Sequence, residues 1–151
     1  MVNPGCHLVN TGWWVAFSGS RRRRWFDRFT RNGFRHCCAF AGLQECARFN
    51  GHNWLFVDPS VIGLRIEVLT DEEMDAAINA IAQDCGHFLW VPKLPPPQPC
   101  YVPRFGAYCV SEVERLLGLP PRALRPEGLY RRLIVLGAER AFEEISWHGF
   151  R

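Results

Sequence analysis

The fold is decided by the stretch Phe105-Gly106-Ala107-Tyr108-Cys109-Val110-Ser111-Glu112-Val113-Glu114, in which a loop becomes a helix and one cysteine lies at the junction. The apolar spacing predicts a helix over 109–118, with Ser111 and Glu114 as a capping box and Gly118 as its end. Backbone N–H groups at a helix start carry partial positive charge and favour thiolate over thiol. Cys109 is therefore a candidate nucleophile.

A candidate base and a candidate orienting carboxylate lie upstream of this helix. His36 belongs to an apolar segment, 34–42, that favours a strand, and Asp58 ends a second strand-like run, 53–58, immediately before Pro59. An imidazole can take a proton from a thiol, and a carboxylate can fix the tautomer of the imidazole. The order along the chain is thus His, Asp, Cys.

The surrounding pattern predicts an α+β fold, with an antiparallel sheet and helices packed on it. The strands are expected at 13–17, 34–42, 53–58, 62–69 and 88–91, and the three middle ones form a meander that makes His36 and Asp58 neighbours. Helices are expected at 25–33, at 71–84 with a Thr70 and Glu73 capping box, and from Pro126 to about Leu133. The proline-rich run 92–99 favours a stiff crossover.

The length of 151 residues and the 48% hydrophobic content indicate one domain, 1–151. Within it we expect an aromatic and basic N-terminal arm over 1–33 and a core over 34–133. The C-terminal extension, 134–151, has no clear pattern.

Composition also limits the partners and the compartment. A formal charge of +3 argues against nucleic acid as a partner, and the run Arg21-Arg22-Arg23-Arg24 favours a solvated loop. No run has the length of a membrane span or the form of a signal peptide. Seven cysteines without a paired spacing indicate a reducing compartment, so we expect a soluble protein that is cytoplasmic or carried in a virion.

A cysteine helix packed on strands that carry a histidine and then a polar residue resembles the papain-like thiol hydrolases, and most closely the NlpC/P60 superfamily. Because the His36 strand precedes the Cys109 helix, the order resembles the circularly permuted branch, which includes the lecithin:retinol acyltransferase-like proteins. The resemblance covers 34–133. The segment Pro126-Glu127-Gly128-Leu129-Tyr130, after an amphipathic helix, resembles the ends of short phage proteins.

The resemblance implies a catalytic role for each of the three residues. Cys109 would attack an amide or ester carbonyl, His36 would act as base and then acid, and Asp58 would hold the imidazole. The chain would then be a hydrolase or acyltransferase acting on a peptide or acyl substrate, such as a phage cell-wall peptidase, without metal or cofactor. The family's oxyanion donor is a Gln or Tyr side chain, so Tyr101 and Tyr108 are candidates beside the Cys109 backbone N–H.

Three other interpretations stay open. Cys109 could be an inert core thiol, and His36 beside Cys37-Cys38 a core histidine. Zinc has enough ligand types, but they lack the usual paired spacing: Cys37, Cys38, Cys46, His52, Cys85, His87 and Cys100. The chain could also be a non-catalytic virion or tail component that binds other phage structural proteins on the same scaffold. Hydrogen-bond reach between Cys109 and His36 beside an open groove favours an enzyme, whereas burial of Cys109 under Trp or Phe rings favours the binding protein.

Overall fold

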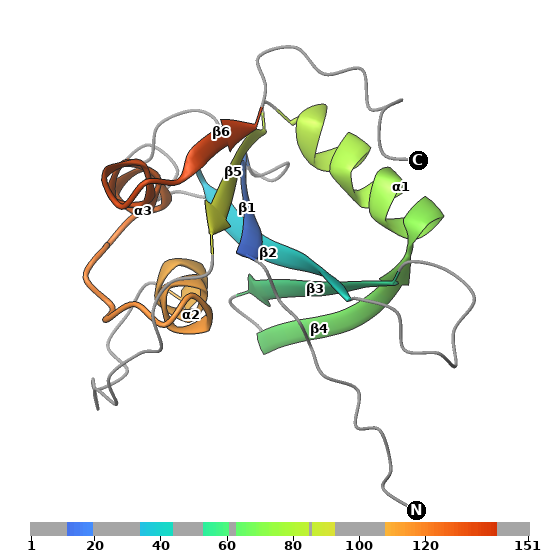
Figure 1. The fold of residues 1–151 in the computed structure, drawn as a ribbon, viewed down its shortest axis with the longest axis horizontal. Helices are drawn as coiled ribbons and strands as arrows, with labels where there is room; N and C mark the ends of the chain where they lie inside the picture. The colour runs from blue at the N-terminus through green and yellow to red at the C-terminus, as the bar shows by residue number, and fades with distance from the viewer. Residues whose placement is uncertain are drawn as a thin grey trace, which may run out of the picture.

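The computed structural model describes residues 12–19, 34–43, 53–60, 63–84, 86–92 and 108–141. The described elements, in chain order, are β1 (Gly12–Ser18), β2 (His36–Leu43), β3 (Asn53–Ser60), β4 (Gly63–Thr70), α1 (Asp71–Ala82), β5 (His87–Pro92), α2 (Tyr108–Leu116), α3 (Pro126–Val135) and β6 (Glu139–Ala141). The six strands form one antiparallel sheet in the order β4-β3-β2-β1-β5-β6 (Figure 1). The predicted α+β class with an antiparallel sheet is confirmed.

The predicted meander is confirmed, because β2, β3 and β4 are consecutive in the sheet as they are in the chain. β1 lies at the centre, between β2 and β5, and β6 pairs with β5. The sheet therefore includes strands on both sides of the predicted core of 34–133, one from the expected N-terminal arm and one from the expected C-terminal extension.

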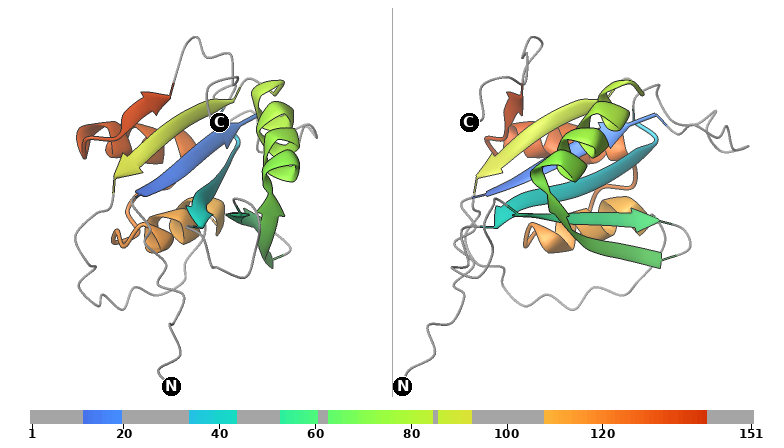
Figure 2. Two further views of the ribbon diagram at one scale, coloured as in Figure 1. Left: turned by 45° about the vertical axis from the view of Figure 1, so that its right-hand side comes forward. Right: turned by 90° about the vertical axis from the view of Figure 1, so that its right-hand side faces the viewer.

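Helices cover both faces of the sheet. α2 and α3 lie over one face and α1 over the other (Figure 2). Alternate side chains of a strand point to opposite faces, so each face has its own core. Cys37 of β2 is buried in the core under α2 and α3, whereas the adjacent Cys38 is buried in the core under α1. Two neighbouring cysteines thus have separate surroundings.

Local sequence signals account for two of the helices. The Thr70 hydroxyl accepts a hydrogen bond from the Glu73 backbone, and the Glu73 carboxylate accepts one from the Thr70 backbone, which confirms the capping box of α1. α3 begins with Pro126, whose missing N–H is not needed in a first turn.

Several predicted features lie outside the described residues: the helix at 25–33, the run Arg21 to Arg24, and the proline-rich run 92–99 beyond Pro92. None of the described helices combines the length and the apolar character needed to cross a membrane.

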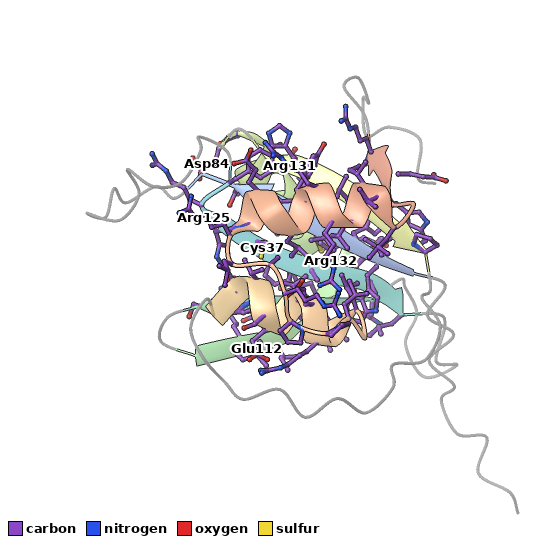
Figure 3. The ribbon with its side chains drawn as sticks, turned by 90° about the vertical axis from the view of Figure 1, so that its left-hand side faces the viewer. Cys37, Asp84, Glu112, Arg125, Arg131 and Arg132 are labelled. Carbon is purple, nitrogen blue, oxygen red and sulfur yellow. The ribbon has the colours of Figure 1, made fainter. Side chains whose placement is uncertain are left out.

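The predicted capping box of α2 is wrong. The helix begins at Tyr108, so Ser111 lies inside it, and the fully buried Glu114 carboxylate turns away toward the following loop. There it accepts hydrogen bonds from the backbone of Arg122 and Ala123 and pairs with the Arg132 guanidinium of α3. Figure 3 shows Arg132 between α2 and α3. This ion pair between a fully buried carboxylate and a partly buried guanidinium links the two helices.

Loss of this pair has an expected cost. We predict that Glu114→Ala lowers the free energy of unfolding by about 3 kcal/mol, because it removes a buried carboxylate that pairs with Arg132 and accepts hydrogen bonds from two backbone N–H groups. Glu127→Ala breaks the more exposed α3 ion pair with Arg131 and should cost at most about 0.5 kcal/mol. Urea denaturation of both variants checks the difference. Equal costs would show that the Glu114 pair contributes no more than a surface pair.

Candidate active site

The three residues of the predicted triad meet where β2 begins and α2 begins. His36 is the first residue of β2, Asp58 lies near the end of β3, and Cys109 lies in the first turn of α2. The β2–β3 ladder pairs Ala39 with Val57; one step further, the same register sets Asp58 opposite Cys38 and diagonal to His36. The antiparallel meander therefore brings the imidazole and the carboxylate together.

The His36 ring is bonded directly to Asp58. The distance from His36 Nε2 to Asp58 Oδ1 is 2.6 Å, and both side chains are about two-thirds buried or more. The hydrogen bond with His36 lowers the pKa of Asp58, so this carboxylate stays charged. Burial by itself lowers the pKa of His36, but the hydrogen bonds with Asp58 and Cys109 outweigh it and raise the pKa to about 9. The ring is thus an imidazolium at neutral pH.

Cys109 has the opposite charge. A hydrogen bond with the Cys37 thiol lowers its pKa most, burial opposes this, and the His36 hydrogen bond and charge lower it further, to about 4. Since Asp58 occupies Nε2 of His36, Nδ1 is the ring nitrogen available to the sulfur. Between about pH 4 and pH 9 the site therefore holds a thiolate beside an imidazolium.

The sequence did not reveal the part played by Cys37. Burial raises the pKa of Cys37 well above its ordinary value, so it keeps its proton and can donate it to the Cys109 sulfur. The Cys37 backbone makes a second hydrogen bond to the same sulfur. Strand alternation separates Cys37 from Cys38, but the face that meets α2 is set by tertiary packing.

The oxyanion candidates fall partly outside this description. Tyr101 and the side chain of Tyr108 lie outside the described residues. The first backbone N–H groups of α2, Cys109 among them, have no partner within the helix.

In the described part of the chain, no three His, Cys, Asp or Glu side chains come together as a metal site, and Cys37, Cys38 and Cys109 are free thiols.

A comparison with known proteins finds no family model, no curated protein and no solved structure that matches the chain. The site itself is therefore the basis for any functional assignment. It holds a thiolate at a helix start, an imidazolium beside it, and a carboxylate bonded to that imidazolium.

The Cys37 hydrogen bond can be tested by substitution. We predict that Cys37→Ala raises the pKa of Cys109 by about 1–2 pH units, because a hydrogen bond to a charged group contributes about 1.5–3 kcal/mol. The measurement is the pH dependence of Cys109 alkylation by iodoacetamide, followed by peptide mass. Cys38→Ala is the matched control, since it removes a buried thiol from the same strand but from the opposite face. An unchanged profile in Cys37→Ala would rule out this contribution.

Proposed function

We propose that the protein is a cysteine-dependent hydrolase or acyltransferase that acts on an amide or ester bond through Cys109, His36 and Asp58. One observation carries this proposal: Cys109 is hydrogen-bonded to His36, which is hydrogen-bonded to Asp58 at 2.6 Å. A thiol that only fills space in a core does not require an imidazolium beside it. A histidine that only packs in a core does not require two charged partners.

The reaction proceeds in two stages. The Cys109 thiolate attacks the carbonyl carbon, a C–S bond forms, and the electron pair of the C=O bond moves to the oxygen. When that pair returns, the bond to the leaving group breaks, and the His36 imidazolium gives its proton to the leaving nitrogen or oxygen. Neutral His36 then takes a proton from water, in a hydrolase, or from the hydroxyl or amine that receives the acyl group, in an acyltransferase. The deprotonated nucleophile attacks the thioester, and the acyl group leaves Cys109.

Other groups of the site assist these steps. Asp58 holds the ring with Nε2 toward itself and stabilises the imidazolium before and after the transfer. The backbone N–H of Cys109 has no partner within α2, because it lies in the first turn, and it is our candidate donor to the oxyanion. The hydrogen bond from Cys37 keeps the thiolate ionised, at some cost in its nucleophilicity.

The order of the elements supports a place in the circularly permuted papain-like branch, because β2 with His36 and β3 with Asp58 precede α2 with Cys109. The non-catalytic alternative needs no interaction between Cys109 and His36, so the hydrogen bond and charge interaction that shift both pKa values support the enzyme. A phage cell-wall peptide as the substrate stays a prediction from the resemblance.

Trapping of the acyl-enzyme tests this proposal. The full chain is mixed with p-nitrophenyl acetate at pH 6, quenched in acid within seconds, and its intact mass and peptides are measured. We expect one acetyl group on Cys109, and the same result for Cys38→Ala. Acetylation spread over several residues, or slower on Cys109 than on a free thiol such as glutathione, would contradict the proposal.

A further inference from the structure

The outer strand β4 carries a row of large apolar side chains that face solvent. The exposed fractions are 50% for Leu64, 59% for Ile66 and 62% for Val68. The neighbouring strand differs, since Val57, which pairs with Ile66, is 5% exposed. Figure 1 shows β4 at the edge of the sheet. An exposed apolar row on an edge strand is unusual in a monomer and marks an interaction site.

The other face of β4 is charged, and Arg65 on this face lies opposite Asp58 of β3. Arg65 and Glu67 alternate with the apolar row, and their side chains form an ion pair at 2.7 Å. Trp54, which pairs with Leu69, belongs to the core under α1. Arg65 and Glu67 therefore lie on the α1 face, and the apolar row lies on the face of α2 and α3. The strand contains no proline and no charge that points into the apolar row.

We propose that β4 pairs with β4 of a second copy of this chain, antiparallel and centred on Ile66, to form a two-fold symmetric dimer with a continuous sheet. In this register Ile66 lies opposite the partner's Ile66, and Leu64 lies opposite the partner's Val68. Arg65 lies opposite the partner's Glu67, and Glu67 opposite the partner's Arg65. Both apolar and charged pairs are thus satisfied by one symmetry operation.

Neighbouring registers lack this complementarity. Centring the pair on Glu67 sets two glutamates opposite each other, and centring it on Arg65 sets two arginines opposite each other. A shift by one residue sets Ile66 opposite a glutamate and turns one apolar row to the wrong face. An in-register parallel pair again aligns like charges. The alternation of Arg65 and Glu67 about Ile66 therefore selects a second copy in one register, whereas an unrelated strand would have no reason to match it.

Charge reversal tests the dimer through its association and not through activity, because Arg65 lies opposite Asp58 of the candidate site and its charge helps to lower the pKa of Asp58. The association of the full chain is measured by sedimentation velocity over a range of concentrations, with Arg65→Glu, Glu67→Arg and the double variant. Either single reversal creates two like-charge pairs across the two-fold axis, so we expect the Kd of the dimer to rise about 10-fold or more. The double variant restores both opposite-charge pairs and should recover a Kd close to that of the parent.

Two controls keep the test specific. The double variant Glu127→Arg with Arg131→Glu reverses an exposed ion pair on α3 and should leave the Kd unchanged. When the parent and the β4 double variant are mixed, a mixed dimer would set like charges opposite each other, so we expect homodimers to predominate. Circular dichroism checks the fold of each variant. Should a charge reversal prevent folding, Ile66→Lys at the centre of the row gives the same loss of association.

Several results would overturn the proposal. A parent chain that stays monomeric up to about 100 µM has no such dimer, and the row would then serve a strand of another protein. A dimer that neither single reversal weakens uses another surface. A dimer that the single reversals weaken, but that the double variant does not restore, lacks the register centred on Ile66.

Discussion

Replacement of Cys109 by alanine is expected to lower kcat/KM for an activated ester by about 10³-fold or more, because it removes the atom that forms the acyl-enzyme bond. The thiolate lies beside His36 and Cys37 and has a pKa of about 4, so at pH 6 almost every molecule of the parent is ready to react. The measurement is the rate of p-nitrophenolate release at substrate concentrations well below KM, where the rate is proportional to kcat/KM.

Cys38→Ala is the control for this loss, since the Cys38 thiol is buried on the other face of β2. It should retain the activity of the parent to within a few-fold. Thermal unfolding of both variants shows whether the fold is preserved. Residual turnover in Cys109→Ala at the level of the parent would mean that another group performs the reaction, and the assignment of the nucleophile would be wrong.

Replacement of His36 by alanine is expected to have the second largest effect, on the ionisation of Cys109. In the parent, alkylation should accelerate as the pH rises through about 4 and then stay level up to about 9, where the imidazolium loses its proton. Without the imidazolium the thiolate loses a charged partner, so its pKa rises toward the free value of about 8.5. Alkylation at pH 6 should then fall by about 10- to 100-fold, since a more basic thiolate is also a better nucleophile.

His87→Ala is the matched control for this prediction. The His87 ring stacks on Phe34 at 4.7 Å and belongs to β5, two strands away from β2. It should leave the pH profile of Cys109 unchanged. If His36→Ala alkylates as fast as the parent at pH 6, the thiolate is stabilised by Cys37 and the helix start alone, and His36 is no part of the pair.

Local signals made much of the fold predictable. The three middle strands β2, β3 and β4 are neighbours both in the sequence and in the sheet, so strand patterns and turn-forming residues in the sequence were enough to predict them. Thr70 with Glu73, and Pro126, identify the starts of α1 and α3. The central place of β1 depends on its pairing with β5, which joins 12–17 to 87–92. No local pattern encodes such a distant partner.

In the candidate site, too, local signals identified some features and tertiary packing decided others. Helix-start and strand signals pointed to Cys109, His36 and Asp58, and the structure brings all three together. The Ser-x-x-Glu pattern at Ser111 and Glu114 was misleading because the helix begins earlier, at Tyr108, and the partly buried Arg132 binds the Glu114 carboxylate. The hydrogen bond from Cys37 depends on which face of β2 receives α2, and that is decided by the packing of the whole sheet.

The low pKa of Cys109 also makes this cysteine a reporter of the native state. Cys109 lies on α2, whereas its partners Cys37 and His36 lie on the distant β2, so a chain without tertiary structure would carry an ordinary thiol there. At pH 5 an alkylating reagent therefore distinguishes folded from unfolded molecules in one sample. A buried, ordinary cysteine reacts when the protein unfolds, whereas Cys109 reacts when the protein is folded. Protection from the reagent measures unfolding, and modification counts the molecules that are folded.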